Sequence, residues 1–338
     1  MKIGIAGAGL LGRLLALKLR AAGHEVHVFD PAAHAEARGA AGWTAAGMLS
    51  PVAELECADD NVFRMGLRSL DLWPQVLAQL PVPVEFDTRG SLLVAHRGDE
   101  GTARGMLDLL ARKAPPAHAP QQLAPAALRE LEPAVQGPPH AWLLPCEGRI
   151  HTVQAMHALV AGAEGTHWHW SQPVGAVEPG VLRTGGGEHR FDLVFDVRGT
   201  GARPQLPVRG VRGEIFWLHA PGVALQRAVR LLHPRHRVYL VPRTDDIVVV
   251  GASEIESEDR SPVSLRSTVE LLAAAHSVVP ELAEARIVHS ESNLRPALPD
   301  NLPHLEVRDG LVRINGLFRH GWLIAPALVE QALSEVNA

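Results

Sequence analysis

The stretch Lys2–Asp30, KIGIAGAGLLGRLLALKLRAAGHEVHVFD, decides the fold of this 338-residue chain. Its first residues, KIGIA, predict a buried strand, and its last residues, EVHVFD, predict a second strand. Between the two strands, a G-x-G-x-x-G turn at Gly7, Gly9 and Gly12 opens a helix that Gly23 ends. The stretch is therefore one βαβ unit with a glycine-rich first turn.

The glycines of this turn have the spacing of a dinucleotide-binding site. Gly7 permits the tight turn, Gly9 lets the backbone approach a pyrophosphate, and Gly12 lets the helix pack closely on the strand. A pyrophosphate would lie at the N-terminus of the helix, where free N–H groups favour negative charge. Asp30 is placed to accept hydrogen bonds from a ribose 2′-hydroxyl, and its charge disfavours the 2′-phosphate of NADP.

The segments after Asp30 bear on which dinucleotide is bound. A plain NAD domain would continue with helix–strand pairs, whereas this chain continues with small residues, GAAGWTAAGMLSP at Gly39–Pro51. Such residues allow close approach of the backbone along the length of a larger cofactor, FAD. A late strand that ends in glycines, Phe191–Gly201, and a helix start after glycines in Asn315–Pro326 also favour FAD. Each feature is also compatible with an ordinary loop, so NAD stays open as the alternative.

Composition and charge exclude several classes of protein. Hydrophobic residues make up 46% and charged residues 20% of the chain, which is typical of a globular protein. The net charge of −5 comes without a block of like charges, so we expect no nucleic-acid partner. No apolar run reaches the ~20 residues of a membrane span, so we expect no membrane partner either. Only three lysines occur, which disfavours a Schiff-base mechanism.

The N-terminal residues run directly into a strand and lack the features of a signal peptide, so we expect a cytoplasmic location. The two cysteines, Cys57 and Cys146, cannot make a disulfide framework. Neither lies at an expected helix N-terminus or beside a histidine in the sequence, which predicts inert thiols.

Strand signals without intervening helices dominate the later part of the chain. GVRGEIFWLH begins at Gly210, and VRLLHP, VYLVPR and IVVVGASE follow it. Successive strands of this kind predict an antiparallel sheet. Residues 84–96, VEFDTRGSLLVAH, predict a hairpin. The fold class is therefore α/β, with a Rossmann-like domain and a second α+β domain built on an antiparallel sheet.

Seven segments together resemble the D-amino-acid oxidase family, most closely its glycine oxidase (ThiO) branch. They occur in family order along nearly the whole chain. They are GIAGAGLLG (Gly4–Gly12), GWTAAGMLSP (Gly42–Pro51), VRGE (Val211–Glu214), VYLVPR (Val238–Arg243), VVVGASEIE (Val248–Glu256), LRPALPDNLP (Leu294–Pro303) and GLFRHGWLIAP (Gly316–Pro326).

The resemblance implies non-covalent FAD and a glycine, small amino acid or amine substrate. It further implies hydride transfer from the α carbon to flavin N5, hydrolysis of the imine to an oxo acid and ammonia, and reoxidation by O2 to give H2O2. It also suggests a role in thiamine biosynthesis. The identity and stereochemistry of the substrate stay open, and a homo-oligomer is an assembly that the sequence allows.

The resemblance also implies roles for individual residues. Arg295 matches the arginine that clamps the substrate carboxylate, and Tyr239 matches the tyrosine that assists it. Arg319 lies beside the flavin end, and Glu254 stands where the branch can have an apolar residue near the substrate side chain. The backbone of Val174 matches the position that holds adenine. For Arg295, Tyr239, Arg319 and Glu254 the alternative is a structural role as an ion pair, packed ring or solvent-facing group.

The expected cofactor-binding residues are gathered from these motifs. They are Gly7, Gly9, Leu10, Leu11, Gly12, Asp30, Thr44, Ala45, Ala46, Gly47, Met48, Val174, Gly199, His320, Gly321, Trp322 and Leu323.

Some residues depart from the family pattern. His320 replaces the usual asparagine, and the run Val197–Gly201 replaces an expected alanine-glycine-tryptophan. No lysine follows Lys113, and the C-terminal motif has no cysteine, which weakens a covalent-flavin interpretation.

A pair of histidines, His167 and His169, lies on one face of an expected strand and could ligate a metal. No third ligand of suitable spacing is evident, so the sequence predicts no metal site.

The expected FAD-binding domain is discontinuous and comprises residues 1–80, 148–206 and 292–338. The expected substrate domain comprises residues 81–147 and 207–291. Two alternatives to an oxidase stay open: a dehydrogenase of the same fold that passes electrons to a quinone or carrier, and a non-catalytic nucleotide-binding protein.

Overall fold

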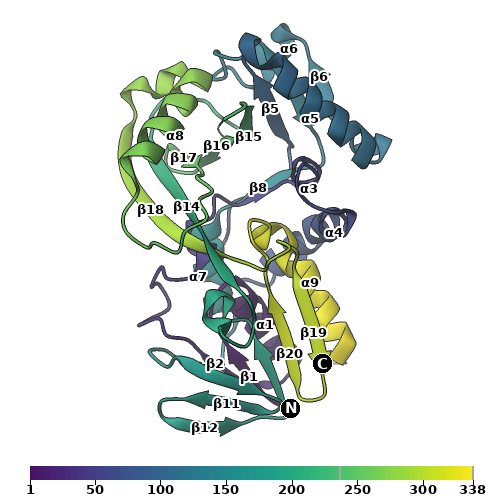
Figure 1. The fold of residues 1–338 in the computed structure, drawn as a ribbon, viewed down its shortest axis with the longest axis vertical. Coiled ribbons are helices and arrows are strands. Elements are labelled where there is room, and N and C mark those ends of the chain that lie inside the picture. Colours follow the sequence, from purple (N-terminus) through teal and green to yellow (C-terminus); the bar gives the residue numbers. More distant parts are fainter. Residues whose placement is uncertain (236, 337–338) are drawn as a thin grey trace.

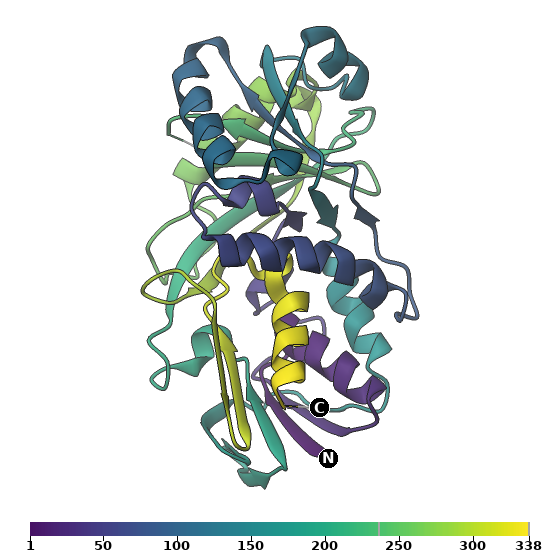
Figure 2. The same cartoon turned by 90° about the vertical axis from the view of Figure 1, so that its right-hand side faces the viewer.

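The computed structural model describes residues 1–235 and 237–336, so residue 236 and residues 337–338 of the expected domains lie outside the described residues. A six-stranded sheet lies in the lower half of the molecule, and an eight-stranded sheet lies in the upper half (Figure 1). In the side view, helix α4 (Asp60–Leu77, dark blue) crosses the middle of the molecule, and helix α9 (Gly321–Val336, yellow) lies in the lower half (Figure 2).

The six-stranded sheet contains the βαβ unit that the N-terminal residues predict. Its strand order is β19 (His304–Arg308), β20 (Leu311–Asn315), β13 (Leu193–Asp196), β1 (Lys2–Ala6), β2 (Glu25–Phe29) and β9 (His167–His169). All neighbouring strands are parallel except β19 and β20, which are antiparallel. Helix α1 (Leu10–Ala21) connects β1 to β2, which confirms the Rossmann-like start.

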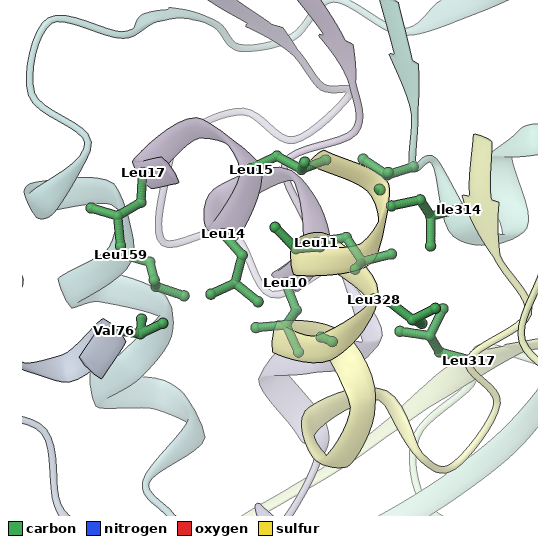
Figure 3. Packing of buried hydrophobic residues seen from close by; sticks show 14 of the residues in the cluster. Leu10, Leu11, Leu14, Leu15, Leu17, Val76, Leu159, Ile314, Leu317 and Leu328 are labelled. Carbon is green, nitrogen blue, oxygen red and sulfur yellow. The ribbon is translucent and has the colours of Figure 1, made fainter. Parts of the chain in front are cut away.

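Helix α1 is apolar on most of its surface because other helices cover it. Leu14 and Leu15 are almost fully buried. The leucines of α1 pack near Leu159 of α7 (Thr152–Gly162) and Leu328 of α9 (Figure 3). This packing fixes the N-terminus of α1, which is the end that begins at the glycine turn.

The eight-stranded sheet is mixed. Its strand order is β18 (Arg286–Ala297), β14 (Arg209–His219), β17 (Ile247–Gly251), β16 (Arg237–Arg243), β15 (Ala228–Leu232), β5 (Ser91–Ala95), β7 (His140–Leu144) and β6 (Gln121–Leu123). The four strands predicted from Gly210 onward are antiparallel to their neighbours in this group. The antiparallel sheet predicted from these four strands is confirmed, and the whole sheet is mixed because β15 pairs with β5 in parallel.

The predicted hairpin at residues 84–96 is wrong. β4 (Phe86–Asp87) pairs with β8 (Gly148–Ile150), whereas β5 pairs with β15 and β7. Each strand therefore finds its partner far along the chain, and the local turn only redirects the backbone from one sheet to another.

Strand β18 is twelve residues long and pairs with β14 along almost its whole length. The two strands extend from the upper sheet toward the lower half (Figure 1). The expected domain boundary at residue 292 falls inside β18, so this strand contributes residues to both expected domains.

The remaining elements complete the two halves. They are α2 (Ala41–Thr44), β3 (Met48–Leu49), α3 (Pro51–Glu54), α5 (Glu100–Lys113), α6 (Pro125–Leu131), β10 (Val174–Glu178), β11 (Val181–Thr184), β12 (Gly187–Arg190) and α8 (Leu265–Val278), with short 3-10 turns at Arg97–Asp99, Pro116–His118, Gly199–Ala202 and Pro280–Glu284. No helix within the described residues is both long and apolar enough to cross a membrane.

Candidate active site

A cavity of about 930 Å³ lies between the two large sheets and is lined by residues from both. Its volume is near the upper end of the range for ligand sites, which is ~300–1,000 Å³. Of the residues predicted for cofactor or substrate, all except Gly12 line it. The structure therefore brings the separate motifs together around one space.

The glycine turn has the backbone geometry that the sequence predicts. Gly7 has a φ of +106°, and a Cβ there would lie 2.7 Å from the carbonyl oxygen of Val197. A Cβ on Gly12 would lie only 1.9 Å from the carbonyl oxygen of Gly7, so Gly12 serves close packing behind the cavity wall. Gly9 is the N-cap of α1 and has no side chain to cap the first N–H groups of that helix.

Asp30 both lines the cavity and fixes the turn. Its carboxylate accepts hydrogen bonds from the backbone N–H groups of Ala8 at 2.6 Å and Ala32 at 2.8 Å. Arg13, a residue that the sequence analysis missed, donates to the carbonyls of Ala8 and Ala35, each at 2.7 Å. Burial lowers the pKa of Arg13 to about 10. These bonds hold the turn and the following loop in place.

The wall formed by Thr44–Met48 is held by a buried arginine. Arg243 donates to the carbonyl of Ala46 at 3.1 Å and to the hydroxyl of Thr152 at 3.0 Å, and burial lowers its pKa to about 10. Gly47 has a φ of +83°, and a Cβ there would lie 2.0 Å from the carbonyl oxygen of Ile150. This wall therefore depends on glycine at one position and on guanidinium bonds at others.

The backbone carbonyl of Val174 already has a partner. Arg198 donates to it at 2.9 Å and also forms a buried ion pair with Asp196 at 2.8 Å. Arg198 belongs to the run that departs from the family pattern, so the departure changes what surrounds the expected adenine position.

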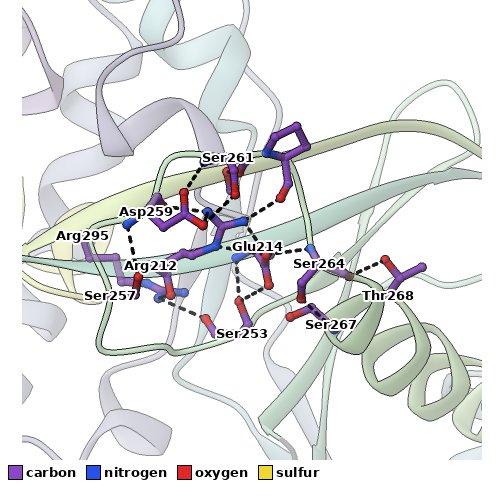
Figure 4. Close-up of polar contacts among 12 residues, drawn as sticks. Arg212, Glu214, Ser253, Ser257, Asp259, Ser261, Ser264, Ser267, Thr268 and Arg295 are labelled. Carbon is purple, nitrogen blue, oxygen red and sulfur yellow. Dashed lines mark hydrogen bonds and ion pairs between the residues drawn. The ribbon is translucent and has the colours of Figure 1, made fainter.

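Arg295 extends from β18 toward the cavity with its guanidinium against backbone carbonyls. It donates to the carbonyl of Ser253 at 3.1 Å and to that of Arg212 at 3.4 Å (Figure 4). Within residues 1–235 and 237–336, no carboxylate lies at ion-pairing distance from Arg295, and burial lowers its pKa. The cavity therefore contains a cation that forms no ion pair with any described residue.

A buried ion pair stabilises the loop that holds Arg295. Glu214 accepts from Arg212 at 2.7 Å, from the N–H of Ser264 at 2.9 Å and from the hydroxyl of Ser253 at 3.0 Å (Figure 4). Glu214 is fully buried, and its hydrogen bonds outweigh the effect of burial and lower its pKa. The loop from Ser253 to Ser264 is thus anchored to β14.

Glu54, which the sequence analysis missed, lies among three basic side chains. Its carboxylate lies 2.8 Å from Arg230, 2.8 Å from Arg319 and 3.1 Å from Nδ1 of His320. Burial opposes ionisation of Glu54, but the two guanidinium groups outweigh burial and hold its pKa well below the usual range. Glu54 lies three residues beyond the matched segment that ends at Pro51, and no local pattern marks it.

The other two expected catalytic residues lie near this cluster. Glu254 is partly exposed, lines the cavity and forms an ion pair with Arg319 at 3.3 Å. Arg319 itself contacts two carboxylates. Tyr239 lies on β16 and lines the cavity, and burial raises the pKa of its hydroxyl.

Neither cysteine is next to a histidine in the sequence, but the fold brings each of them close to one. Sγ of Cys146 lies 2.8 Å from Nδ1 of His118. One potential ligand atom from each of Cys57, Glu54 and His320 lies within 4.8 Å of the other two. Burial raises the pKa of both thiols, which favours the protonated, less reactive form.

Comparisons with known proteins identify the family of this chain. The model of the DAO family, FAD dependent oxidoreductases, matches residues 2–332. A Rhizobium etli protein named as a thiamine biosynthesis oxidoreductase, ThiO, is 37% identical over 330 residues, which are 97% of this chain and 94% of the relative. A glycine oxidase of Geobacillus kaustophilus is 26% identical over 354 residues, covering 96% of this chain and 89% of the relative.

The fold is also that of a solved relative. A crystal structure of glycine oxidase from Geobacillus kaustophilus matches with a TM-score of 0.87 at 25% identity, covering 99% of this chain and 94% of that chain. The resemblance found in the seven sequence segments is thereby confirmed. This chain belongs to the DAO family of FAD-dependent oxidoreductases.

Proposed function

We propose that this protein is an oxidase of glycine or another small amino acid or amine, using non-covalent FAD and releasing H2O2. One observation carries the proposal. A single cavity has the uncapped N-terminus of α1 in its wall at one region and Arg295, with no ionic partner among the described residues, at another. An anionic dinucleotide and a substrate carboxylate match these two regions in charge.

The residues around the cavity fit FAD. Gly7 and Gly47 have positive φ values, and a Cβ at either position would meet backbone, so these two walls need glycine to keep their course around the cavity. In the proposed arrangement, the α1 N-terminus holds the pyrophosphate, Asp30 the ribose, and the segments Thr44–Met48 and His320–Leu323 the remainder. When bound, FAD supplies the acceptor for the substrate hydride and the route of electrons to O2.

The chain contributes positioning and charge. Arg295 receives the substrate carboxylate through its planar fork, which fixes the orientation of the α carbon. The Tyr239 hydroxyl stays protonated because burial raises its pKa, so it can donate a hydrogen bond to the same carboxylate. Arg319 is held by Glu54 and adds positive charge beside the proposed flavin end. In this proposal β18 belongs to both the cofactor-binding and the substrate-binding parts.

The test is a visible spectrum of the purified protein before and after anaerobic glycine. We expect an oxidised-flavin spectrum that bleaches, and peroxide in proportion to substrate when air is admitted. Bleaching without peroxide would identify a dehydrogenase. A flavin that no small amino acid or amine bleaches would reject the proposed substrate class, and protein that takes up NAD but not FAD would overturn the cofactor assignment.

A role in thiamine biosynthesis is proposed from the relative named ThiO. The gene should restore growth without thiamine to a bacterial strain that lacks its ThiO. An Arg295→Ala version should fail to do so. If both the parent gene and the Arg295→Ala version restored growth, the rescue would not depend on amino-acid oxidation.

Replacing Gly12 with alanine should abolish retention of FAD, because the new Cβ would meet the Gly7 carbonyl at 1.9 Å and displace the turn. The measurement is the ratio of flavin to protein absorbance after gel filtration, with circular dichroism to monitor folding. Gly105→Ala is the matched control, since a Cβ there meets nothing within 4 Å. A folded Gly12→Ala protein with full flavin content would contradict the proposed role of the turn.

Replacing Gly213 with alanine should raise the KM for glycine by about tenfold while flavin stays bound. The new Cβ would lie 2.5 Å from a guanidinium nitrogen of Arg295, and the flexible end of that side chain must shift. A small displacement of a positioning group is enough for such an effect. Steady-state kinetics checks it, and an unchanged KM would show that the position of Arg295 is unimportant for binding.

A further inference from the structure

A cluster of histidines lies on the six-stranded sheet, on residues that do not line the proposed active-site cavity. Strands β2 and β9 are parallel, and their register places His27 opposite His167. Glu25 precedes His27 by two residues and therefore lies on the same face of β2. One potential ligand atom from each of Glu25, His27 and His167 lies within 4.8 Å of the other two.

The orientation of His27 is fixed at both ring nitrogens. Nε2 lies 2.8 Å from a carboxylate oxygen of Glu25, and Nδ1 lies 3.1 Å from Nε2 of His169. The ring of His169 in turn stacks on Phe29, with centroids 4.2 Å apart. Ligating histidines in metal sites are held in this way, with the second nitrogen bonded to a neighbouring group.

The donor set suits a transition metal. Two imidazoles and one carboxylate are ligands that Zn²⁺ and its neighbours among divalent metals prefer, whereas Mg²⁺ and Ca²⁺ prefer oxygen alone. The three donor atoms already lie within 4.8 Å of one another, and the stacked rings of His27 and His167 have centroids 4.4 Å apart.

We propose that Glu25, His27 and His167 form a binding site for one divalent transition-metal ion, with Zn²⁺ as the representative. The ion clips the three-residue edge strand β9 to β2 and leaves one coordination position for water. The sequence analysis found no third ligand beside His167 and His169 because the ligands come from β2, about 140 residues earlier. The proposal is independent of the proposed oxidase activity.

A competing cation is present at the same carboxylate. Nζ of Lys2 lies 3.9 Å from Glu25, and both side chains are about half exposed. Lys2 can therefore swing into solvent when an ion binds. Removing its charge should favour the ion, so Lys2→Gln should tighten Zn²⁺ binding by about threefold.

The experiment is a Zn²⁺ titration of untagged, chelator-treated protein carrying its cofactor, by competition with a chromogenic indicator. A Cys57→Ser background removes a thiol from a second group, Glu54, Cys57 and His320, that could take up the metal. We expect one ion per chain with micromolar affinity. His167→Asn and Glu25→Gln should each weaken binding at least tenfold.

The matched control is His34→Asn. His34 and Glu36 form an exposed pair at 3.0 Å, and no third ligand of the described residues joins it in a metal group. This variant should bind Zn²⁺ as the parent does. A second readout is stability, since Zn²⁺ at a hundred times Kd should raise Tm by about 4 °C in the parent and not in His167→Asn.

Absence of stoichiometric binding would overturn the site. So would binding that His167→Asn, Glu25→Gln and His34→Asn weaken equally. Loss confined to the two site variants, together with tighter binding by Lys2→Gln, would establish it. None of these results depends on substrate turnover, so they are separate from the test of the oxidase proposal.

Discussion

Replacing Arg295 with alanine is expected to raise the KM for amino acids by about two orders of magnitude or more. Removing one partner of a desolvated charge pair costs about 2–5 kcal/mol in binding, which corresponds to that range. The guanidinium faces the cavity, and it donates hydrogen bonds to the carbonyls of Ser253 and Arg212. A substrate carboxylate is therefore the partner that its charge lacks in the proposed complex.

Folding should tolerate this substitution. No carboxylate among the described residues depends on Arg295 for its neutralisation, so alanine leaves no buried anion unpaired. We expect normal flavin content and an unchanged or slightly higher Tm. Arg295→Lys is the informative companion, because lysine keeps the positive charge and loses the planar guanidinium. Its KM should lie between that of the parent protein and that of Arg295→Ala. An unchanged KM in Arg295→Ala would remove Arg295 from the carboxylate role.

Replacing Glu54 with glutamine is expected to lower the free energy of unfolding by about 3–5 kcal/mol, as for other broken buried ion pairs. Glutamine has nearly the same shape but no charge, so it leaves Arg230 without its ionic partner and weakens the hold on Arg319. Urea unfolding monitored by tryptophan fluorescence measures the effect. Glu330→Gln is the control, because Glu330 forms an exposed pair with Arg68 and should cost at most about 1 kcal/mol.

The effect of Glu54 should depend on pH in a defined direction. Its pKa is lower in the folded protein than in the unfolded chain, so its ionised form stabilises the fold at pH values above the unfolded pKa of about 4.3. The difference between parent and Glu54→Gln should be complete at pH 7 and shrink as the pH falls below that value. A difference that grows in acid would contradict the ion-pair explanation.

The parts of the fold that the sequence predicts are those with contiguous signals. The G-x-G-x-x-G turn, α1 and β2 occupy one stretch, and their geometry follows from steric requirements at Gly7 and Gly12. Arg295 and Arg319 are found through short motifs around them. In these cases the residues that matter lie within a few positions of a recognisable pattern.

The parts that escape prediction depend on partners far along the chain. Glu54 meets Arg230 and Arg319 at separations of 176 and 265 residues, and only the fold brings them together. Likewise, β5 pairs with β15 rather than with β4, because the large sheet offers it two partners and a buried position. Arg198 donates to the carbonyl of Val174, 24 residues earlier, a contact that neither segment signals by itself.

Strand β18 sets the spacing between the cofactor-facing and substrate-facing parts of the cavity. Asn293 donates to the hydroxyl of Thr44 in the wall segment, and Arg295, two residues later on the same face, reaches toward the substrate region. The spacing between them is set by extended backbone paired to β14, without an intervening loop. A shift of one residue in this register would turn both side chains to the opposite face and would remove the wall contact and the cationic group together.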